Sequence, residues 1–486
     1  MSITGALSNA LSGLTASGKA AQVVSSNLAN AMTEGFARRE LSLSAQNFGA
    51  ASGVRVNGVM RVVDEQVVAD RRLADADSGH AERVLDFYTR LEELTGLPGE
   101  DGSLSDRVAA FQSGLITAAS RPDSHDRLRA AADRAVEMVN TFQQMSAGIQ
   151  DLRQQADRDI GAMVDRVNTL LGQVQDLNQR VTGALNTGGD PAALLDERQK
   201  VIDALSSFIP IRQVPRDRGA VALFSTGGSI LLDGTAATLG FQRTNVIEPH
   251  MTVGGGHLSG LTVNGVPVRT DSDSGPLRGG ALAAAFEIRD EHSIAAQSQL
   301  DAVARDLIER FQSPSVDPSL GIGDAGLFTD GGVAFDPVNE TGLAGRLALN
   351  AAVDPAAGGE VWRLRDGILA ASPGDSGNGA LLQNMVNVMD LRRVPTSGDY
   401  GGGNQTLGTL VGSHLSGIGS SRLTAEREQS FAAARLDSLT AMQLEDGVDS
   451  DEEMQKLLLI EQAYSANAKM IQTIDEMIQT LLRLGA

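Results

Sequence analysis

Apolar residues near the start of the chain recur in alternating steps of four and three positions. This spacing places them on one face of a helix, the seam that packs against a partner helix in a coiled coil. Ser17 is the only polar residue in the row. The pattern predicts an N-terminal helix whose assembly seam is formed by Ile3, Leu7, Ala10, Leu14, Ala21, Val24 and Leu28.

The same spacing returns near the other end of the chain, with Asn467 as the single strongly polar seam residue. Ser450 precedes this second helix and Glu453 follows three positions later, which is the spacing of a capping box. We therefore expect a C-terminal helix that begins at Ser450 and pairs with the N-terminal helix as a coiled coil. Its seam is formed by Leu457, Ile460, Tyr464, Asn467, Ile471, Ile474, Ile478 and Leu481.

Between these ends, helical and β patterns alternate. Helical periodicity predicts helices over 81–94, 104–119, 123–183, 280–311 and 413–444. Residues 209–269 instead show short apolar runs divided by Gly, Asp and Asn, which is typical of a small β domain. Residues 313–379 are rich in Gly, Pro and Asp, with a β-like piece at Arg346–Asn350.

These patterns predict an α+β protein of several domains, in which a long helical bundle carries small β-rich outer insertions. The expected order is an N-terminal coiled-coil helix of an inner core (1–40), the first part of the bundle (41–208), a β-rich insertion (209–278), a helix returning to the bundle (279–312), a Gly- and Pro-rich β-containing segment (313–407), a bundle helix (408–446) and the C-terminal coiled-coil helix of the inner core (447–486).

The composition narrows the classes of partner. A net charge of -21 repels phosphate backbones and anionic membrane surfaces, so we expect no nucleic-acid partner. No apolar run approaches the ~18 residues of a membrane span, and the first positive charge is Lys19, so we expect no membrane insertion and no Sec-type signal. The chain has no cysteine, which excludes disulfides and thiolate metal sites.

Three stretches match the sequences of known ligand-binding motifs but lack the residues or the context that those motifs require. Gly13–Ala20 has P-loop spacing, but Ala20 replaces the Ser or Thr that would hold magnesium, and the stretch lies inside the N-terminal helical pattern. Gly321–Gly326 matches a dinucleotide fingerprint but follows prolines and no strand. Asp271–Gly275 suggests a calcium loop but lacks its downstream Glu. The six histidines show no metal-binding or catalytic spacing. We expect no catalytic residues, no cofactor and no metal.

Two segments near the ends of the chain carry distinctive motifs. The N-terminal segment is Asn27–Arg38, which carries the motif residues Asn30, Gly35, Phe36 and Arg38. The C-terminal segment carries Gly447, Val448, Asp451, Glu452 and Glu453, followed by Ala463–Lys469. Both segments resemble the flagellar axial proteins, the family of rod, hook and hook-associated subunits. Two internal stretches, Asp196–Ser206 and Gly279–Asp290, are similar to segments of the hook-associated members.

The resemblance implies a structural subunit of the bacterial flagellum, exported without a cleaved signal, at the junction between hook and filament. Its implied partners are copies of itself, the hook protein, a second hook-associated junction protein and an export chaperone that covers the C-terminal seam. Three alternatives stay open: a hook or distal rod subunit, a secreted coiled-coil interaction protein, and a hydrolase inserted in the outer domains.

Overall fold

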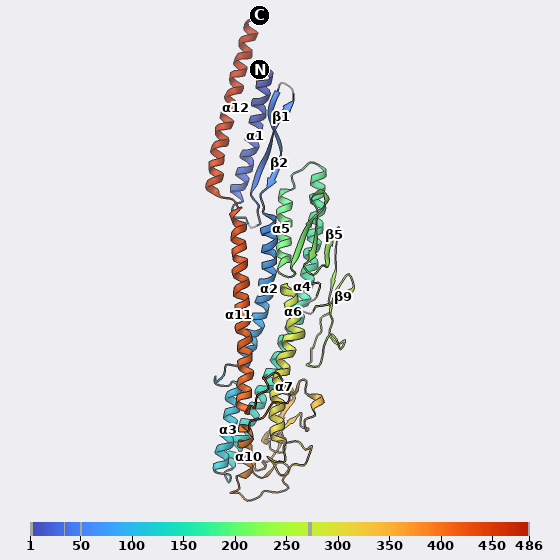
Figure 1. The fold of residues 1–486 in the computed structure, drawn as a ribbon, viewed down its shortest axis with the longest axis vertical. Helices are drawn as coiled ribbons and strands as arrows, with labels where there is room; N and C mark the ends of the chain where they lie inside the picture. The colour runs from blue at the N-terminus through green and yellow to red at the C-terminus, as the bar shows by residue number, and fades with distance from the viewer. Residues whose placement is uncertain (1–2, 34, 49–50, 271–274, 485–486) are drawn as a thin grey trace. The chain divides into compact units, whose positions relative to one another are not determined.

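The computed structural model describes residues 3–33, 35–48, 51–270 and 275–484, and Figure 1 traces the chain. The chain divides into two compact units. We call Met1–Ser78, Arg166–Thr238 and Ala432–Ala486 the terminal unit, and Gly79–Asp165 with Leu239–Phe431 the central unit. Three helices contribute residues to both units: α2 (Glu65–Thr95), α4 (His125–Asn186) and α11 (Leu407–Glu445).

The terminal unit combines the two ends of the chain with a hairpin and a small sheet. Strands β1 and β2 form an antiparallel hairpin, and β3 to β6 form an antiparallel four-stranded sheet in sequence order. Its own elements are α1 (Ile3–Ala29), β1 (Arg39–Phe48), β2 (Ala51–Arg61), α5 (Ala192–Ser206), β3 (Ile211–Pro215), β4 (Val221–Ser225), β5 (Ile230–Asp233), β6 (Thr235–Ala236) and α12 (Ser450–Leu484).

The central unit is mostly helical and carries two small antiparallel sheets, β7-β8-β9 and β10-β11. A π-helical turn over Ile288–His292 joins α6 to α7. Its own elements are α3 (Leu104–Ser120), β7 (Leu239–Gly240), β8 (Leu261–Val263), β9 (Val266–Val268), α6 (Gly280–Glu287), α7 (Ser293–Phe311), β10 (Phe328–Asp330), α8 (Leu343–Arg346), β11 (Leu347–Leu349), α9 (Arg363–Asp366) and α10 (Ala380–Asp390).

A large apolar core fills the central unit. The rings of Phe111, Phe311 and Phe328 lie 5.2 to 6.0 Å apart in tilted and edge-to-face pairs, and all three are buried. Such aromatic pairs stabilise a core beyond the area that they bury. Leu, Val, Ala and Met side chains from α3, α4, α7, α10 and α11 surround them. This unit therefore buries its apolar surface within its own chain.

The helices predicted from periodicity are all present. The helix expected over 123–183 is α4, which runs through Gly148, Gly161 and Gly172 without a break. The helix expected over 280–311 is continuous through α6, the π turn and α7. The P-loop-like stretch Gly13–Ala20 lies inside α1, and Gly321–Gly326 contains no regular strand or helix. Residues 271–274 of the calcium-loop-like stretch lie outside the described residues.

Other expectations need correction. Residues 41–61, expected to begin a helical bundle, form most of the β1–β2 hairpin. Leu41 and Leu43 alternate with Ser42 and Ser44, and this period of two residues is typical of a β-strand. Residues 209–278, expected as one β-rich insertion, form two sheets, one in each unit. In 313–407 the pairing of β10 with β11 agrees with the expected β content, but α10 was not predicted.

Candidate assembly site of the terminal helices

Helices α1 and α12 pack against each other in the terminal unit (Figure 1). Asn27 near the end of α1 donates from Nδ2 to Glu453 Oε2, 2.9 Å away, near the start of α12. Gly13 lies against the side-chain amide of Asn467. A step of fourteen residues along α1, from 13 to 27, thus corresponds to fourteen residues back along α12, from 467 to 453. The two helices therefore run antiparallel.

The predicted seams are only partly covered by this pairing. In α1, Ala10 and Val24 are buried, Ile3, Leu7, Leu14, Ser17 and Ala21 are half-buried, and Leu28 is exposed. In α12, Ile474 is buried, Leu457, Ile460, Asn467, Ile471 and Ile478 are half-buried, and Tyr464 and Leu481 are exposed. The pairing of α1 with α12 therefore leaves most residues of both predicted seams partly exposed to water.

A second apolar stripe on α12 has no cover in the described part of the chain. We call it the free stripe: Leu459, Met470, Met477, Leu481 and Leu484, which are between 45% and 80% exposed. Their separations of eleven, seven, four and three residues place them on one helical face, beside the face that meets α1. Contiguous exposed apolar surface of this kind marks an interaction site. Of these five residues only Leu481 belongs to the predicted seam, and the other four were not predicted from the sequence.

The N-terminal motif turns the chain from α1 into β1. Asn30 Nδ2 bonds Ser26 O at 2.8 Å as α1 ends, and Gly35 adopts a φ of 73°, which L side chains rarely tolerate. Asn27 then clamps the returning strand, because its Oδ1 accepts from Arg39 N at 3.0 Å and its Nδ2 donates to Arg39 O at 2.9 Å. The Arg39 guanidinium lies 4.8 Å from the ring centroid of Phe36. Arg38 is paired with Glu40.

Asp196 on α5 binds the same segment, the start of β1, and the end of β2. Its carboxylate accepts from Arg39 Nη2 at 3.0 Å, from Arg61 Nε at 2.7 Å and from the Ala37 backbone N–H at 3.4 Å. The side chains are largely buried, so these charge-assisted bonds are stronger than surface pairs. Asp196 therefore ties α5 to both strands of the hairpin. The sequence analysis noted this segment only for its resemblance.

Arg198, two residues after Asp196, forms hydrogen bonds near a different strand, β4. Its Nη1 donates to Asn178 Oδ1 at 2.8 Å and to Gly219 O at 2.7 Å, both neutral acceptors. Burial, with the nearby charges of Arg61 and Arg72, lowers the pKa of Arg198 to about 10. The guanidinium stays charged at neutral pH, since that pKa still lies well above 7. It joins α4 and α5 to the loop before β4.

The start of α12 corrects the predicted capping box. Asp449, not Ser450, accepts from the first helical N–H groups, those of Asp451 at 2.8 Å and Glu452 at 3.2 Å. An Asp side chain suits this position because it meets the positive end of the helix dipole. Gly447 and Val448 are half-buried in the link from α11. Asp451 and Glu452 are exposed in the first turn.

Glu453 turns inward instead of closing a capping box. It is 1% exposed, and Oε1 accepts from Lys456 Nζ at 3.1 Å while Oε2 accepts from Asn27. Partial burial opposes the charge on Lys456, yet hydrogen bonds to Glu452 and Glu453 raise the pKa of Lys456. A buried carboxylate with a partner on each oxygen is satisfied. Glu453 thus joins the N-terminal motif to the C-terminal one.

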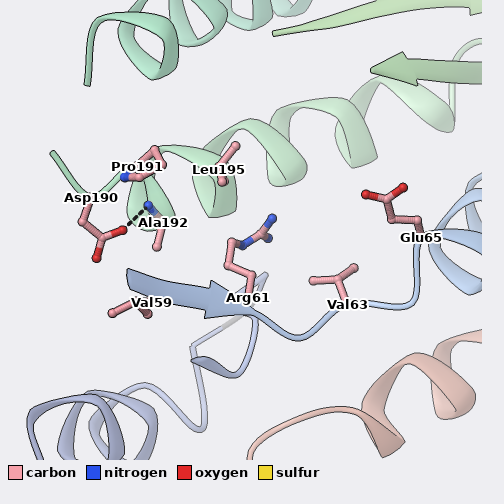
Figure 2. Close-up of a pocket in the computed structure, with 8 residues that line it drawn as sticks. All are labelled: Val59, Arg61, Val63, Glu65, Asp190, Pro191, Ala192 and Leu195. Atoms are coloured by element: carbon pink, nitrogen blue, oxygen red, sulfur yellow. Dashed lines mark hydrogen bonds between the residues drawn. The ribbon is translucent and has the colours of Figure 1, made fainter. Parts of the chain in front are cut away.

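A cavity of about 250 Å³ lies beside this cluster. Figure 2 shows Val59, Arg61 and Val63 on one side and Pro191, Ala192 and Leu195 on the other, with Glu65 and Asp190 at its ends. Arg61 is already bonded to Asp196 and Gln199, and Asp190 Oδ1 accepts from Ala192 N at 2.9 Å. The lining residues include no nucleophile beside a base, so the cavity offers no catalytic pair.

The second internal stretch of the resemblance forms a buried polar network in the central unit. Arg289, in the π turn, bonds Asp157 at 2.8 Å and both Asp290 oxygens at 2.9 and 2.8 Å. The Asp157 carboxylate also accepts from Thr244 N at 2.8 Å. The Arg289 guanidinium lies 5.1 Å from the ring centroid of Phe286. π turns often mark special packing, and here one aims Arg289 at the segment that follows β7.

The described residues contain neither a metal-binding cluster nor a helix that could span a membrane. Over residues 3–33, 35–48, 51–270 and 275–484, no group of three or more His, Cys, Asp or Glu side chains could hold a metal ion. Within the same ranges, no helix is both long and apolar enough to cross a membrane.

Family models match two parts of the chain. Residues 88–314 match the model described as the flagellar hook-associated protein FlgK helical domain, and residues 445–484 match the flagellar basal body rod FlgEFG protein C-terminal model. Both models describe flagellar proteins, so these two parts of the chain are similar to flagellar axial proteins.

Three curated relatives are named flagellar hook-associated protein 1. The protein of Salmonella typhimurium strain LT2 is 28% identical over 240 residues, and that of Escherichia coli K12 is 26% identical over 240, each match covering 48% of this chain and 43% of the relative. The protein of Bacillus subtilis strain 168 is 23% identical over 98% of this chain and 97% of its own length. This chain is thus similar to proteins named flagellar hook-associated protein 1, in one case over nearly its full length.

These matches differ in extent. The chain spans less than half the length of the Salmonella and Escherichia relatives in their matched regions, and nearly the full length of the Bacillus one. Among solved structures, the flagellar hook junction protein FlgK from Burkholderia pseudomallei is similar with a TM-score of 0.45 and 19% identity, covering 54% of this chain and 47% of that chain.

Proposed function

We propose that this chain is a structural subunit of the bacterial flagellum at the junction between hook and filament, assembled through its terminal helices. The family supports the flagellar role, because relatives along the chain carry the name hook-associated protein 1. The observation that carries the assembly mechanism is the free stripe of α12, which leaves the terminal pair with an apolar face of heptad spacing. Its occupant is a neighbouring copy.

In this mechanism the pair of α1 and α12 acts as one half of a coiled-coil layer. A neighbouring copy covers the free stripe, and the half-buried seam residues close against it. Burying each exposed Leu or Met would contribute about 1 to 2 kcal/mol. The contact repeats around a tube axis because each copy presents one face and receives another. The hook protein, a second hook-associated junction protein and an export chaperone remain predicted partners.

Deleting the gene in its own organism tests the position in the flagellum. We expect electron microscopy to show hooks without filaments, with flagellin released into the medium. Loss of the hooks themselves would favour the hook or distal rod alternative. Normal motility with attached filaments would favour a secreted coiled-coil interaction protein and overturn the proposal.

Charge substitutions on the free stripe test the assembly mechanism. The double variant Met470→Glu and Met477→Glu places two carboxylates where a neighbouring copy would pack, so we expect it to leave the deletion strain without filaments. Gln472→Glu, an exposed position on the opposite face of α12, serves as the control and should restore filaments. Full filament assembly with the double variant would exclude the free stripe as the contact.

A further inference from the structure

Two polar positions of α12 meet two special positions of α1 at matching levels of the antiparallel pair. Gly13 lies against Asn467, and a Cβ added to Gly13 would stand 2.7 Å from Asn467 Oδ1. Asn27 lies against Glu453, with a hydrogen bond of 2.9 Å. The two contacts lie two heptads apart on both helices. They share one register of α1 against α12.

The heptad series that contains these contacts sets small residues of α1 at the levels of larger residues of α12. Along α1 the series reads Ala6, Gly13, Ala20 and Asn27. Along α12, in the opposite direction, it reads Ile474, Asn467, Ile460 and Glu453. The observed register therefore sets Ala6 and Ala20 at the levels of Ile474 and Ile460. Gly13 is the only member of its series without a Cβ, and the Asn467 amide occupies the space that it leaves.

Heptad seams alone do not choose this register. A slip of seven residues keeps apolar residues facing apolar residues, because the pattern repeats with that period. The slip would, however, set Asn467 against the methyl group of Ala20 and Asn27 against Ile460. Glu453 would lose Asn27, which leaves a buried carboxylate oxygen without this donor. Leaving a buried polar group unpaired costs roughly 1 to 3 kcal/mol.

We infer that Gly13 with Asn467, and Asn27 with Glu453, form a register lock that selects one antiparallel alignment of the terminal helices. The Asn467 amide occupies the space beside Gly13, so a Cβ at position 13 would force the Asn467 side chain to move. Asn27 serves two purposes, because the same side chain also clamps Arg39 at the start of β1. The lock concerns the pairing of α1 with α12, so it stands or falls independently of the chain's position in the flagellum.

Cysteine cross-linking in the full-length chain tests the register, since the natural sequence contains no cysteine to interfere. The pair Ala10→Cys with Ile471→Cys reports the observed register. The pair Ala10→Cys with Ile478→Cys reports a slip of seven residues. We expect the first pair to form the disulfide at least about tenfold faster, the ratio that corresponds to 1.4 kcal/mol.

Asn467→Ile then removes the lock at its centre while keeping the helix apolar. We expect the preference for the register pair to fall by about tenfold, and to fall further when Asn27→Ala is added. Gly13→Ala should also weaken it, and adding Asn467→Ala to Gly13→Ala should relieve the clash. Gln472→Ile, on the exposed opposite face, is the control and should leave the ratio unchanged.

Two results would overturn the inference. One is equal cross-linking of the two cysteine pairs in the natural background, which would mean that no register is selected. The other is an unchanged preference in Asn467→Ile, which would mean that the seams choose the register without the polar residues.

Discussion

Helices α7 and α12 are both amphipathic, but they bury very different shares of their residues. Twelve of the 19 residues of α7 are buried inside the central unit. Only Glu453 and Ile474 are buried among the 35 residues of α12. The central unit stabilises its helices within one chain. The terminal pair leaves apolar surface exposed, and this is the surface that we propose for assembly.

The polar residues of the two helices differ in the same way. In α7, Arg310 and Asp306 form a buried pair, and Arg310 Nη1 also donates to Val388 O at 2.7 Å. Asp301 accepts from Gly342 N at 2.7 Å and Ala344 N at 2.8 Å. In α12 the buried polar residue is Glu453, at the register lock. Buried polar bonds therefore hold loops in the central unit and align helices in the terminal unit.

The largest expected effect is the removal of an aromatic ring from the central core. Phe311→Ala should lower the free energy of unfolding by about 3 to 5 kcal/mol, because it leaves a cavity between Phe111 and Phe328. Chemical denaturation followed by circular dichroism measures the change. Leu482→Ala on α12, an exposed position, is the control and should change stability by less than about 0.5 kcal/mol. Equal losses would contradict the division into core and assembly surface.

A second test uses acid to separate the two regions. The Tyr400 hydroxyl donates to Gln299 O at 2.6 Å, so it accepts from His414 Nδ1–H at 3.2 Å. The other ring nitrogen, Nε2, is buried with no hydrogen-bond partner in the described structure. Burial lowers the pKa of His414 to about 4. The folded central unit thus holds this ring neutral.

In the unfolded chain, His414 has the ordinary pKa of histidine, about 6.5, which lies above its pKa in the folded protein. The stability that depends on neutral His414 is therefore complete above pH 6.5 and is lost as the pH falls toward 4. The loss should approach about 3 kcal/mol. Unfolding curves of the natural chain and of His414→Leu between pH 4 and 7 measure it. Parallel pH profiles would show that this ring does not contribute.

A smaller effect is expected at the start of α12. Asp449→Ala should destabilise α12 by about 1 kcal/mol, because it removes the acceptor for two backbone N–H groups. Hydrogen exchange of the amides in the first turns of α12 measures the change. Ser450→Ala tests the capping residue expected from sequence and should have little effect. Faster exchange in Ser450→Ala than in Asp449→Ala would reverse this assignment.

Long periodic segments were predictable, and short ones were not. The helices α1, α4, α11 and α12 followed from spacing alone, because a helix that packs on one side must repeat its apolar residues. The β1–β2 hairpin was not predicted, although Leu41 and Leu43 alternate with serines, because an alternation over only four residues is a weak signal. The capping residue was misplaced by one position, because Asp449 and Ser450 are both good caps and only the backbone geometry chooses between them.

The candidate site divides along the same line. Asn30 and Gly35 are residue types that commonly end helices and form turns, and they lie at the end of α1 and in the turn that follows it. The role of Asp196 as the acceptor for Arg39 and Arg61 could not be read, because more than 130 residues separate it from both. The free stripe could not be predicted either, because the sequence shows that Leu459 and Met470 are apolar but not whether another element covers them. Their exposure depends on where α1 lies.

The amino-acid order by itself determined that both ends of this chain are amphipathic helices, because heptad spacing is a property of one segment and its backbone geometry. Only the tertiary structure decided which residues of the two helices contact each other. It set Gly13 against Asn467 and Asn27 against Glu453, and it left the free stripe of α12 uncovered. Contacts between residues hundreds of positions apart arise from packing. A local sequence pattern does not specify which distant residues will pack against it.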